Sequence, residues 1–341
     1  MPRLHDMRRR RALCAVVALT LLSLAPSAFA REISDMGGRK IVIPDNVVRV
    51  VTLGAVPVIN GFLFALGEQK AIVNGVPSQL ARKWQFIFAP ELVGKPVVQG
   101  AEAGPSAESI VALKPDIVLT MDLPAAEALA KVGVKAVYLR WTAPSDVKAV
   151  VTLLGDVFHK ERVAADYAAW FDRELADVAK RIDAAKANRP RVLYANLKRL
   201  TQPHRIADGW ISRAGGVSMT DDGRMQESFV FSLEQLLSWD PEVLIVADQG
   251  EKQQALTDPR LRNVSAIKTG RVHVAPAGAH LWANRTIEQP LTVLWAAGII
   301  HPELFDQQRL VADAGAFYAR FFHVTLSRDQ IEDILAGTPA R

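Results

Sequence analysis

The sequence predicts an α/β protein made of two Rossmann-like lobes, each with a mostly parallel sheet, joined by a single long α-helix. Short β-branched runs alternate along the chain with longer helical patterns, as expected for strands that helices cross over into parallel sheets. The candidate strands fall into two groups of three, and one long amphipathic pattern separates the groups. Half of the 341 residues are apolar, which is enough for two lobes with a core each.

The candidate strands are short runs rich in Val, Ile and Leu. The first group covers residues 47–53, 116–121 and 135–139, and the second covers residues 191–195, 243–247 and 271–274. Because the two groups match in number, we expect one sheet in each lobe.

The pattern between the two groups spans residues 161–188. Its apolar residues recur every three or four positions opposite a heavily charged face, which predicts one amphipathic helix, and Pro190 follows it. A surface helix of one large domain would show the same pattern, and the matching strand groups favour a helix that joins two lobes. The apolar positions are Val163, Tyr167, Trp170, Phe171, Leu175, Val178 and Ile182.

The first thirty residues are typical of an export signal. A basic start at residues 8–11 precedes an apolar run at residues 12–25, and the small-residue triplet at residues 28–30 predicts cleavage before Arg31. The apolar run is shorter than the ~20 residues that span a bilayer, which favours a cleaved signal over a membrane anchor. No later run is long and apolar enough to span a membrane, so insertion after cleavage is not expected. The arginines also resemble a weak twin-arginine signal, which leaves the export route open.

These patterns predict four parts of the chain and a periplasmic location. Residues 1–30 are the signal peptide, residues 31–158 the N-terminal lobe, residues 159–189 the connecting helix and residues 190–341 the C-terminal lobe. Cys14, the one cysteine, falls in the signal, so the mature chain has no thiol chemistry.

Charge and missing motifs exclude several functional classes. The signal holds five of the 41 Lys and Arg but only one of the 36 Asp and Glu, so the mature chain is close to neutral, which argues against nucleic-acid binding. The sequence contains no phosphate-binding G-x-x-x-x-G-K-[ST] loop, no G-x-G-x-x-G after the first strand and no G-x-S-x-G elbow. The seven His residues are scattered, without the spacing of a built-in metal site.

Two segments repeat one pattern in the two predicted lobes. Residues 108–119, ESIVALKPDIVL, and residues 232–246, SLEQLLSWDPEVLIV, each combine a short helix, a proline-acid turn and a buried strand. Residues 35–44, DMGGRKIVIP, and residues 49–54, RVVTLG, precede them.

In the order and spacing of these motifs the chain resembles the periplasmic substrate-binding proteins of iron-siderophore, haem and vitamin B12 ABC transporters, the two-lobed type with a helical backbone. The resemblance covers nearly all of the mature chain. It implies a protein that binds a ferric siderophore, a cobalamin-like compound or a related metal chelate between its lobes. It also implies delivery to a permease dimer with its ATPase subunits, no catalysis, and no cofactor apart from a metal within the transported ligand.

The resemblance assigns Glu108 and Glu234 to permease docking. They match the acidic positions that in this family project from the two lobes and pair with arginines of the permease, a directional contact that would fix orientation. The alternative is that both are ordinary glutamates favoured at helix starts by the helix dipole.

Ligands of open α/β lobes bind beyond the carboxyl ends of the strands, which indicates three segments. Residues 74–88, a predicted loop, carry a cation and aromatic rings suited to an anionic chelate, although the rings could instead fill the core. In residues 196–212 His204 is typical of a solvated loop histidine, and in residues 277–288 His280 could ligate iron or simply form a hydrogen bond. The predicted ligand-binding residues are Arg82, Trp84, Trp210, His280, Trp282 and Arg285.

Two other functions stay open. A binding protein for haem or for a small oxyanion such as molybdate has the same architecture. A periplasmic enzyme or a sensor without a permease is the alternative of a different class.

Overall fold

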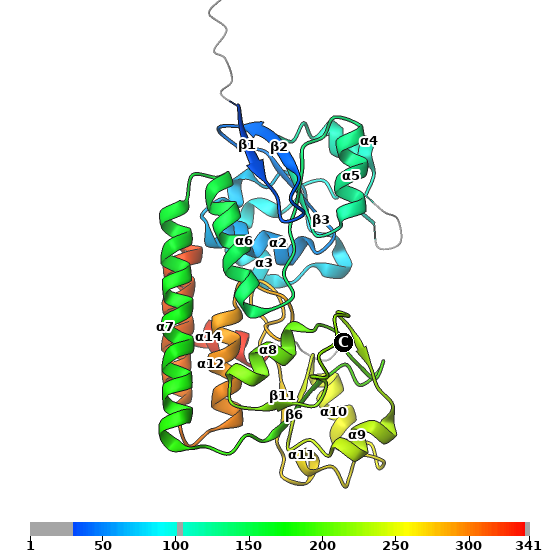
Figure 1. The fold of residues 1–341 in the computed structure, drawn as a ribbon, viewed down its shortest axis with the longest axis vertical. Helices are drawn as coiled ribbons and strands as arrows, with labels where there is room; N and C mark the ends of the chain where they lie inside the picture. Colours follow the sequence, from blue (N-terminus) through cyan, green and yellow to red (C-terminus); the bar gives the residue numbers. More distant parts are fainter. Residues whose placement is uncertain (1–29, 101–104, 338–341) are drawn as a thin grey trace, which may run out of the picture.

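The computed structural model describes residues 30–100 and 105–337. All but the last residue of the predicted signal peptide therefore lies outside the described residues. Two α/β lobes lie one above the other, with the long helix α7 (Glu161–Ala185) along one side of both (Figure 1). The predicted fold class is confirmed.

The upper lobe contains an antiparallel hairpin and a parallel sheet. Strands β1 (Ala30–Ser34) and β2 (Lys40–Pro44) form the hairpin, which the sequence did not reveal as strands. The sheet has the order β3-β4-β5, formed by β3 (Val50–Leu53), β4 (Ile117–Thr120) and β5 (Ala136–Tyr138). All of β3 and β4 is buried, because helices cover both faces of the sheet.

The lower lobe contains a second parallel sheet, of order β11-β10-β6-β8. Its strands are β6 (Arg191–Ala195), β8 (Val217–Ser218), β10 (Val243–Val246) and β11 (Val272–Val274). The short strands β7 (Thr201–Gln202) and β9 (Phe229–Val230) form a separate antiparallel pair. All six predicted strands lie in these two sheets, three in each.

Helices connect the strands and cover the sheets. None of the described helices combines the length and hydropathy of a transmembrane segment. Besides α7 they are α2 (Val56–Ala65), η1 (Gln69–Ala71), η2 (Ser78–Leu80), α3 (Lys83–Phe88), η3 (Pro90–Leu92), α4 (Ala107–Ala112), α5 (Leu123–Lys131), α6 (Pro144–Val157), α8 (Ile206–Arg213), α9 (Leu233–Trp239), α10 (Gln249–Thr257), α11 (Ser265–Lys268), α12 (Gln289–Ile300), α13 (Gln307–Phe317), the π-helical turn η4 (Tyr318–Phe322) and α14 (Arg328–Leu335).

Helix α7 (Glu161–Ala185) is continuous and spans roughly 37 Å at 1.5 Å per residue. Its predicted apolar stripe faces the protein, with Tyr167, Trp170 and Phe171 buried. The helix ends slightly earlier than expected, because Lys186 adopts the left-handed conformation at φ 47°.

The core differs from the expected two separate cores. One continuous cluster of buried apolar side chains includes Ile59 of α2, Phe171 of α7, Trp210 of α8 and Ile245 of β10, and so extends through both lobes and the connecting helix. In the part of the chain that the structure describes, the sheet faces turned away from α7 have clusters of their own. A shared, closely packed core resists relative movement of the lobes.

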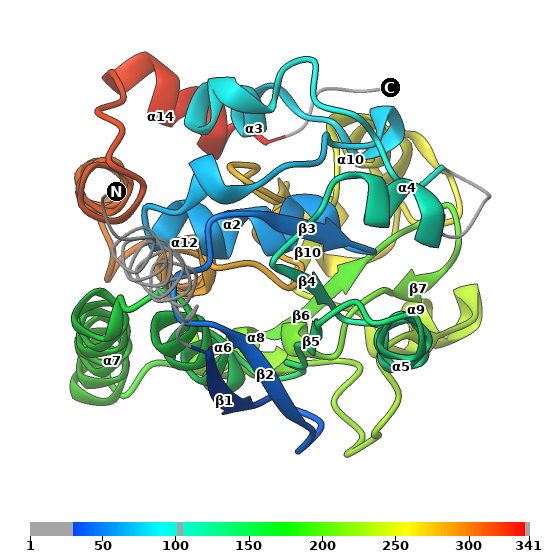
Figure 2. The same ribbon diagram turned by 90° about the horizontal axis from the view of Figure 1, so that it is seen from above.

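The C-terminal segment also crosses to the upper lobe. Tyr318 and Phe322 of η4 pack on Phe88 with ring centroids 5.0 and 4.9 Å away. Helix α14 lies beside α3 (Figure 2), where Lys83 pairs with Asp333. Part of the segment that we predicted to belong to the C-terminal lobe therefore covers the N-terminal lobe.

Candidate ligand-binding site

The loop after β11, residues 275–288, is held by the buried carboxylate of Glu288. This carboxylate accepts hydrogen bonds from the backbone N–H groups of Ala279 (2.9 Å) and His280 (3.3 Å). It also accepts from the hydroxyls of Thr286 (2.7 Å) and Tyr318 (2.5 Å). Burial raises the pKa of Glu288, although these four bonds oppose the shift. A local network thus fixes the path of the loop that carries His280 and Arg285.

The loop is also tied to the surrounding helices and strands. Tyr167 of α7 donates to Ile287 O at 2.5 Å, and Tyr194 of β6 donates to Asn284 Oδ1 at 2.7 Å. Glycine at position 278 lets the backbone of the loop pass close to the carboxylate of Glu288, because a Cβ there would lie 2.0 Å from Glu288 Oε1. The loop therefore presents its remaining side chains from a rigid base.

Three of the predicted ligand residues interact electrostatically: Arg82 at the start of α3, His280 and Arg285. Burial lowers the pKa of His280 to about 3, and the nearby charges of Arg82 and Arg285 act in the same direction. The imidazole is therefore neutral at pH 7, and its buried Nδ1 has no hydrogen-bond partner among the described residues. It can donate or accept one hydrogen bond, depending on its tautomer.

Arg285 lies close to groups of both lobes. Burial lowers its pKa, while Glu227 of the lower lobe and Tyr138 of the upper lobe raise it. Arg285 Nη1 lies 3.8 Å from Glu227 Oε2, and His204 Nδ1 lies 3.6 Å from the same oxygen. Two cationic or potentially cationic groups thus converge on one carboxylate.

The pairing of β7 with β9 explains why His204 and Glu227 meet. Gln202 stands opposite Phe229 in this antiparallel register. Continuing the register by two residues places His204 opposite Glu227, as in a cross-strand pair of opposite charge. The sequence offered little sign of this pairing, because each strand is only two residues long.

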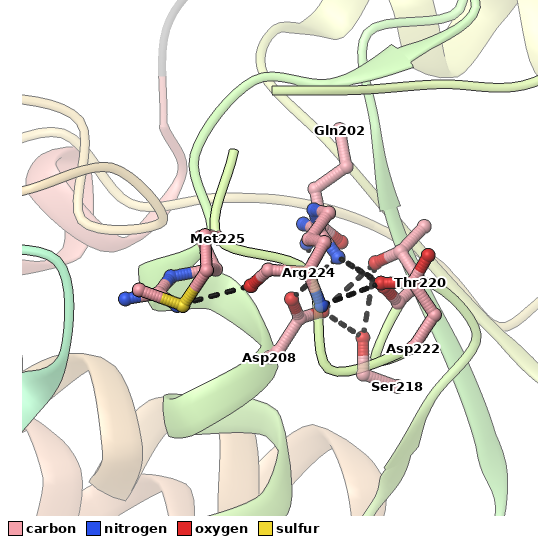
Figure 3. Close-up of polar contacts among 8 residues, drawn as sticks. Gln202, Asp208, Ser218, Thr220, Asp222, Arg224 and Met225 are labelled. Atoms are coloured by element: carbon pink, nitrogen blue, oxygen red, sulfur yellow. Dashed lines mark hydrogen bonds and ion pairs between the residues drawn. The ribbon is translucent and has the colours of Figure 1, made fainter. Parts of the chain in front are cut away.

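The segment leading to Glu227 is held by a second buried carboxylate, that of Asp208 (Figure 3). Asp208 accepts hydrogen bonds from Gln202 (2.8 Å), Ser218 (2.6 Å) and Thr220 (2.8 Å). Its other oxygen pairs with Arg224 Nη1 at 2.9 Å, and both side chains are less than a tenth exposed. This network positions the backbone three residues before Glu227.

A cavity of about 350 Å³ lies beside this segment. Its lining includes Thr142 and Pro144 of the upper lobe and Arg205, Asp208 and Arg224 of the lower lobe. Among residues 30–100 and 105–337, no three His, Cys, Asp or Glu side chains are grouped in a way that could hold a metal ion.

The three predicted tryptophans lie in the core. Trp84 is 4% exposed and belongs to helix α3, where we had expected a loop, while Trp210 and Trp282 are fully buried. Trp210 Nε1 donates to Ala283 O at 3.2 Å and so helps to hold the loop after β11. Their burial gives no support to stacking on a ligand, and their ligand roles stay predictions.

Glu108 and Glu234 are exposed near the starts of α4 and α9. The two helices lie on different lobes, on the side away from α7 (Figure 1). Each is capped by a serine side chain, and each segment ends in a left-handed residue before proline, Lys114 at φ 48° and Asp240 at φ 43°. The repeated motif thus has the same local structure in both lobes, while the docking role stays a prediction.

Comparisons with known proteins agree with this architecture. The sequence profile of the family described as periplasmic binding protein matches residues 60–279. The molybdate-binding protein MolA of Haemophilus influenzae is 26% identical over 345 residues, covering 92% of this chain and 97% of MolA.

Solved structures show the same fold. The structure of MolA bound to molybdate has a TM-score of 0.73 at 24% identity, covering 87% of this chain and 99% of that one. A periplasmic solute binding protein from Veillonella parvula gives 0.74 at 24% identity, covering 90% and 97%. Helicobacter pylori CeuE in complex with Ni-His gives 0.73 at 16% identity, covering 90% and 99%.

Proposed function

Because the chain belongs to the periplasmic binding protein family, we propose that it binds a small oxyanion such as molybdate between its lobes and delivers it to an ABC importer. The family relationship supports a solute-binding protein of the ABC transporter type rather than an enzyme. We further propose that the protein works in the periplasm after removal of the predicted signal peptide.

The observation that carries this proposal is that Arg82 and Arg285 lie near enough to the neutral His280 for their charges to lower its pKa. Arginine suits oxyanions because its planar guanidinium presents several donors in fixed directions. The neutral imidazole can add one donor without adding charge. MolA, the relative at 26% identity, is described as binding molybdate, which points to the same class of ligand.

A metal chelate is the second candidate, as the sequence first indicated. The unpartnered His280 Nδ1 favours it, since a neutral imidazole could complete the coordination of a chelated metal. Burial of the three tryptophans weakens the case for stacking on an aromatic chelate. The small oxyanion is therefore our first choice.

Isothermal titration calorimetry separates these candidates. Wild-type protein and Arg285→Gln would be titrated with molybdate, sulfate, a ferric catecholate, cobalamin and haem. We expect molybdate to bind and Arg285→Gln to weaken it by about 10- to 100-fold, the usual cost of losing a charge-assisted hydrogen bond. Arg162→Gln, at an exposed position near the start of α7, is the matched control and should bind like the wild type.

If the wild type binds one of the chelates but not molybdate, the metal chelate replaces the oxyanion as the proposed ligand. Chemical conversion of any of these compounds would contradict both.

A further inference from the structure

Three acidic side chains near the candidate site are held in different ways. Asp208 accepts three hydrogen bonds of 2.6 to 2.8 Å and pairs with an arginine at 2.9 Å. Glu288 accepts four hydrogen bonds of 2.5 to 3.3 Å. Both oxygens of Glu227 are buried, yet neither has a hydrogen-bond partner within 3.5 Å among the described residues. Asp208 and Glu288 therefore have the contacts of structural carboxylates, and Glu227 does not.

The contacts of Glu227 are electrostatic and loose. Its Oε2 lies 3.6 Å from His204 Nδ1 and 3.8 Å from Arg285 Nη1, beyond the range of about 2.7 to 3.2 Å for an N–H···O hydrogen bond. Burial raises the pKa of Glu227, but His204, Arg285 and the charge of Arg205 outweigh it and leave that pKa below its usual value. The carboxylate is therefore ionised at neutral pH without being locked in place.

The backbone around Glu227 is fixed on both sides. Before it, Arg224 pairs with Asp208 and its carbonyl oxygen accepts from Arg205 Nη1 at 3.0 Å. After it, Phe229 pairs with Gln202 in the short sheet of β7 and β9. A change of partner at Glu227 thus needs only rotation of its side chain.

We propose that Glu227 is an internal counter-ion of the ligand site, whose carboxylate competes with an anionic ligand for Arg285 and His204. This inference rests on the proposed oxyanion function and adds a rule of selectivity. A doubly charged oxyanion attracts Arg285 more strongly than one carboxylate does, so it displaces Glu227. A singly charged anion of the same shape gains no such advantage, so Glu227 excludes it.

The test compares molybdate with perrhenate, a tetrahedral oxyanion that carries one charge instead of two. Wild type, Glu227→Gln and the control Glu127→Gln, an exposed glutamate on α5, would be titrated with both anions by calorimetry. We expect Glu227→Gln to bind molybdate about tenfold more tightly, the effect of roughly one charge interaction. It should also gain binding of perrhenate, while the control matches the wild type.

Glu227→Ala removes the same charge and must shift affinity in the same direction, which guards against a folding defect of one variant. If the wild type binds molybdate and both variants bind it equally or more weakly, Glu227 contacts or supports the ligand and the counter-ion role is wrong. If neither the wild type nor the variants bind molybdate, the oxyanion function itself fails, and this inference falls with it.

Discussion

Arg205 of the lower lobe donates a 2.8 Å hydrogen bond from Nη2 to Oγ1 of Thr142 in the upper lobe. Its other terminal nitrogen donates to Arg224 O at 3.0 Å. One guanidinium therefore links the segment that leads to Glu227 with the opposite lobe, beside the cavity of about 350 Å³. The lobes are coupled here as well as through α7 and the shared core.

Thr142→Val should lower the free energy of unfolding by about 1–2 kcal/mol, because it leaves a half-buried guanidinium donor without its acceptor while keeping the side-chain shape. Urea unfolding measures this change. Thr152→Val is the matched control, since that exposed hydroxyl bonds only to Lys148 O within its own helix. Equal losses in the two variants would show that the contact between the lobes adds no stability.

Gly278→Ala should be strongly destabilising. The added Cβ would lie 2.0 Å from Glu288 Oε1 and 2.1 Å from Tyr318 Oη, so the carboxylate network that holds the His280 loop must open. We expect a loss of about 3 kcal/mol or more, as for other broken buried networks, and weaker molybdate binding. Thermal unfolding followed by circular dichroism, with calorimetry for the ligand, tests both effects.

Gly315→Ala serves as the control for that variant. Gly315 lies within α13, and nothing stands within 4 Å of an added Cβ. Alanine there should stabilise the protein by about 0.5–1 kcal/mol through its higher helix propensity. A similar response at both glycines would contradict the close approach at Gly278.

His280→Gln should change how stability depends on pH. Imidazole in the unfolded chain has a pKa of about 6.5, whereas the pKa of His280 in the folded protein is about 3. Between these values the unfolded chain binds a proton that the folded chain does not, so His280 makes the wild type lose stability as pH falls from 6.5 towards 3.

The variant lacks this contribution and should lose less stability on acidification, by at most about 1.4 kcal/mol for each pH unit. Urea unfolding at several pH values between 4 and 7 gives the difference, in which other titrating groups cancel. If the free energy of unfolding depends on pH in the same way in both proteins, His280 titrates normally in the wild type.

The parts of the fold that the sequence predicts are those with local, periodic signals. Strand β10 and residues 192–195 of β6 are continuous apolar runs, and the buried stripe of α7 recurs at helical spacing over 25 residues. The strands β7, β8 and β9 have two residues each and show no period, so they escaped prediction.

The candidate site shows the same limit. Arg82, His280 and Arg285 were predicted as ligand residues because they lie in segments assigned to the carboxyl ends of strands, and their ligand role stays a prediction. Glu227 was missed, because its place in the cluster depends on a cross-strand register rather than on its neighbours in sequence. The tryptophans could not be placed, since one residue type serves both to fill a core and to line a ligand site.

Replacing the exposed glutamates Glu108 and Glu234 with alanine tests delivery to the permease separately from ligand binding. Each lies near the start of a short helix on a different lobe. If they pair with permease arginines, each single variant should greatly reduce ATP-driven uptake of molybdate into proteoliposomes that contain the cognate transporter, because two separated contacts fix the docked orientation.

The affinity for molybdate, measured by calorimetry, should stay at the wild-type value in these variants. The control Glu127→Ala should change neither uptake nor affinity. Normal uptake by both variants would leave the two residues as ordinary helix-start glutamates, and loss of affinity would place them in the ligand site instead.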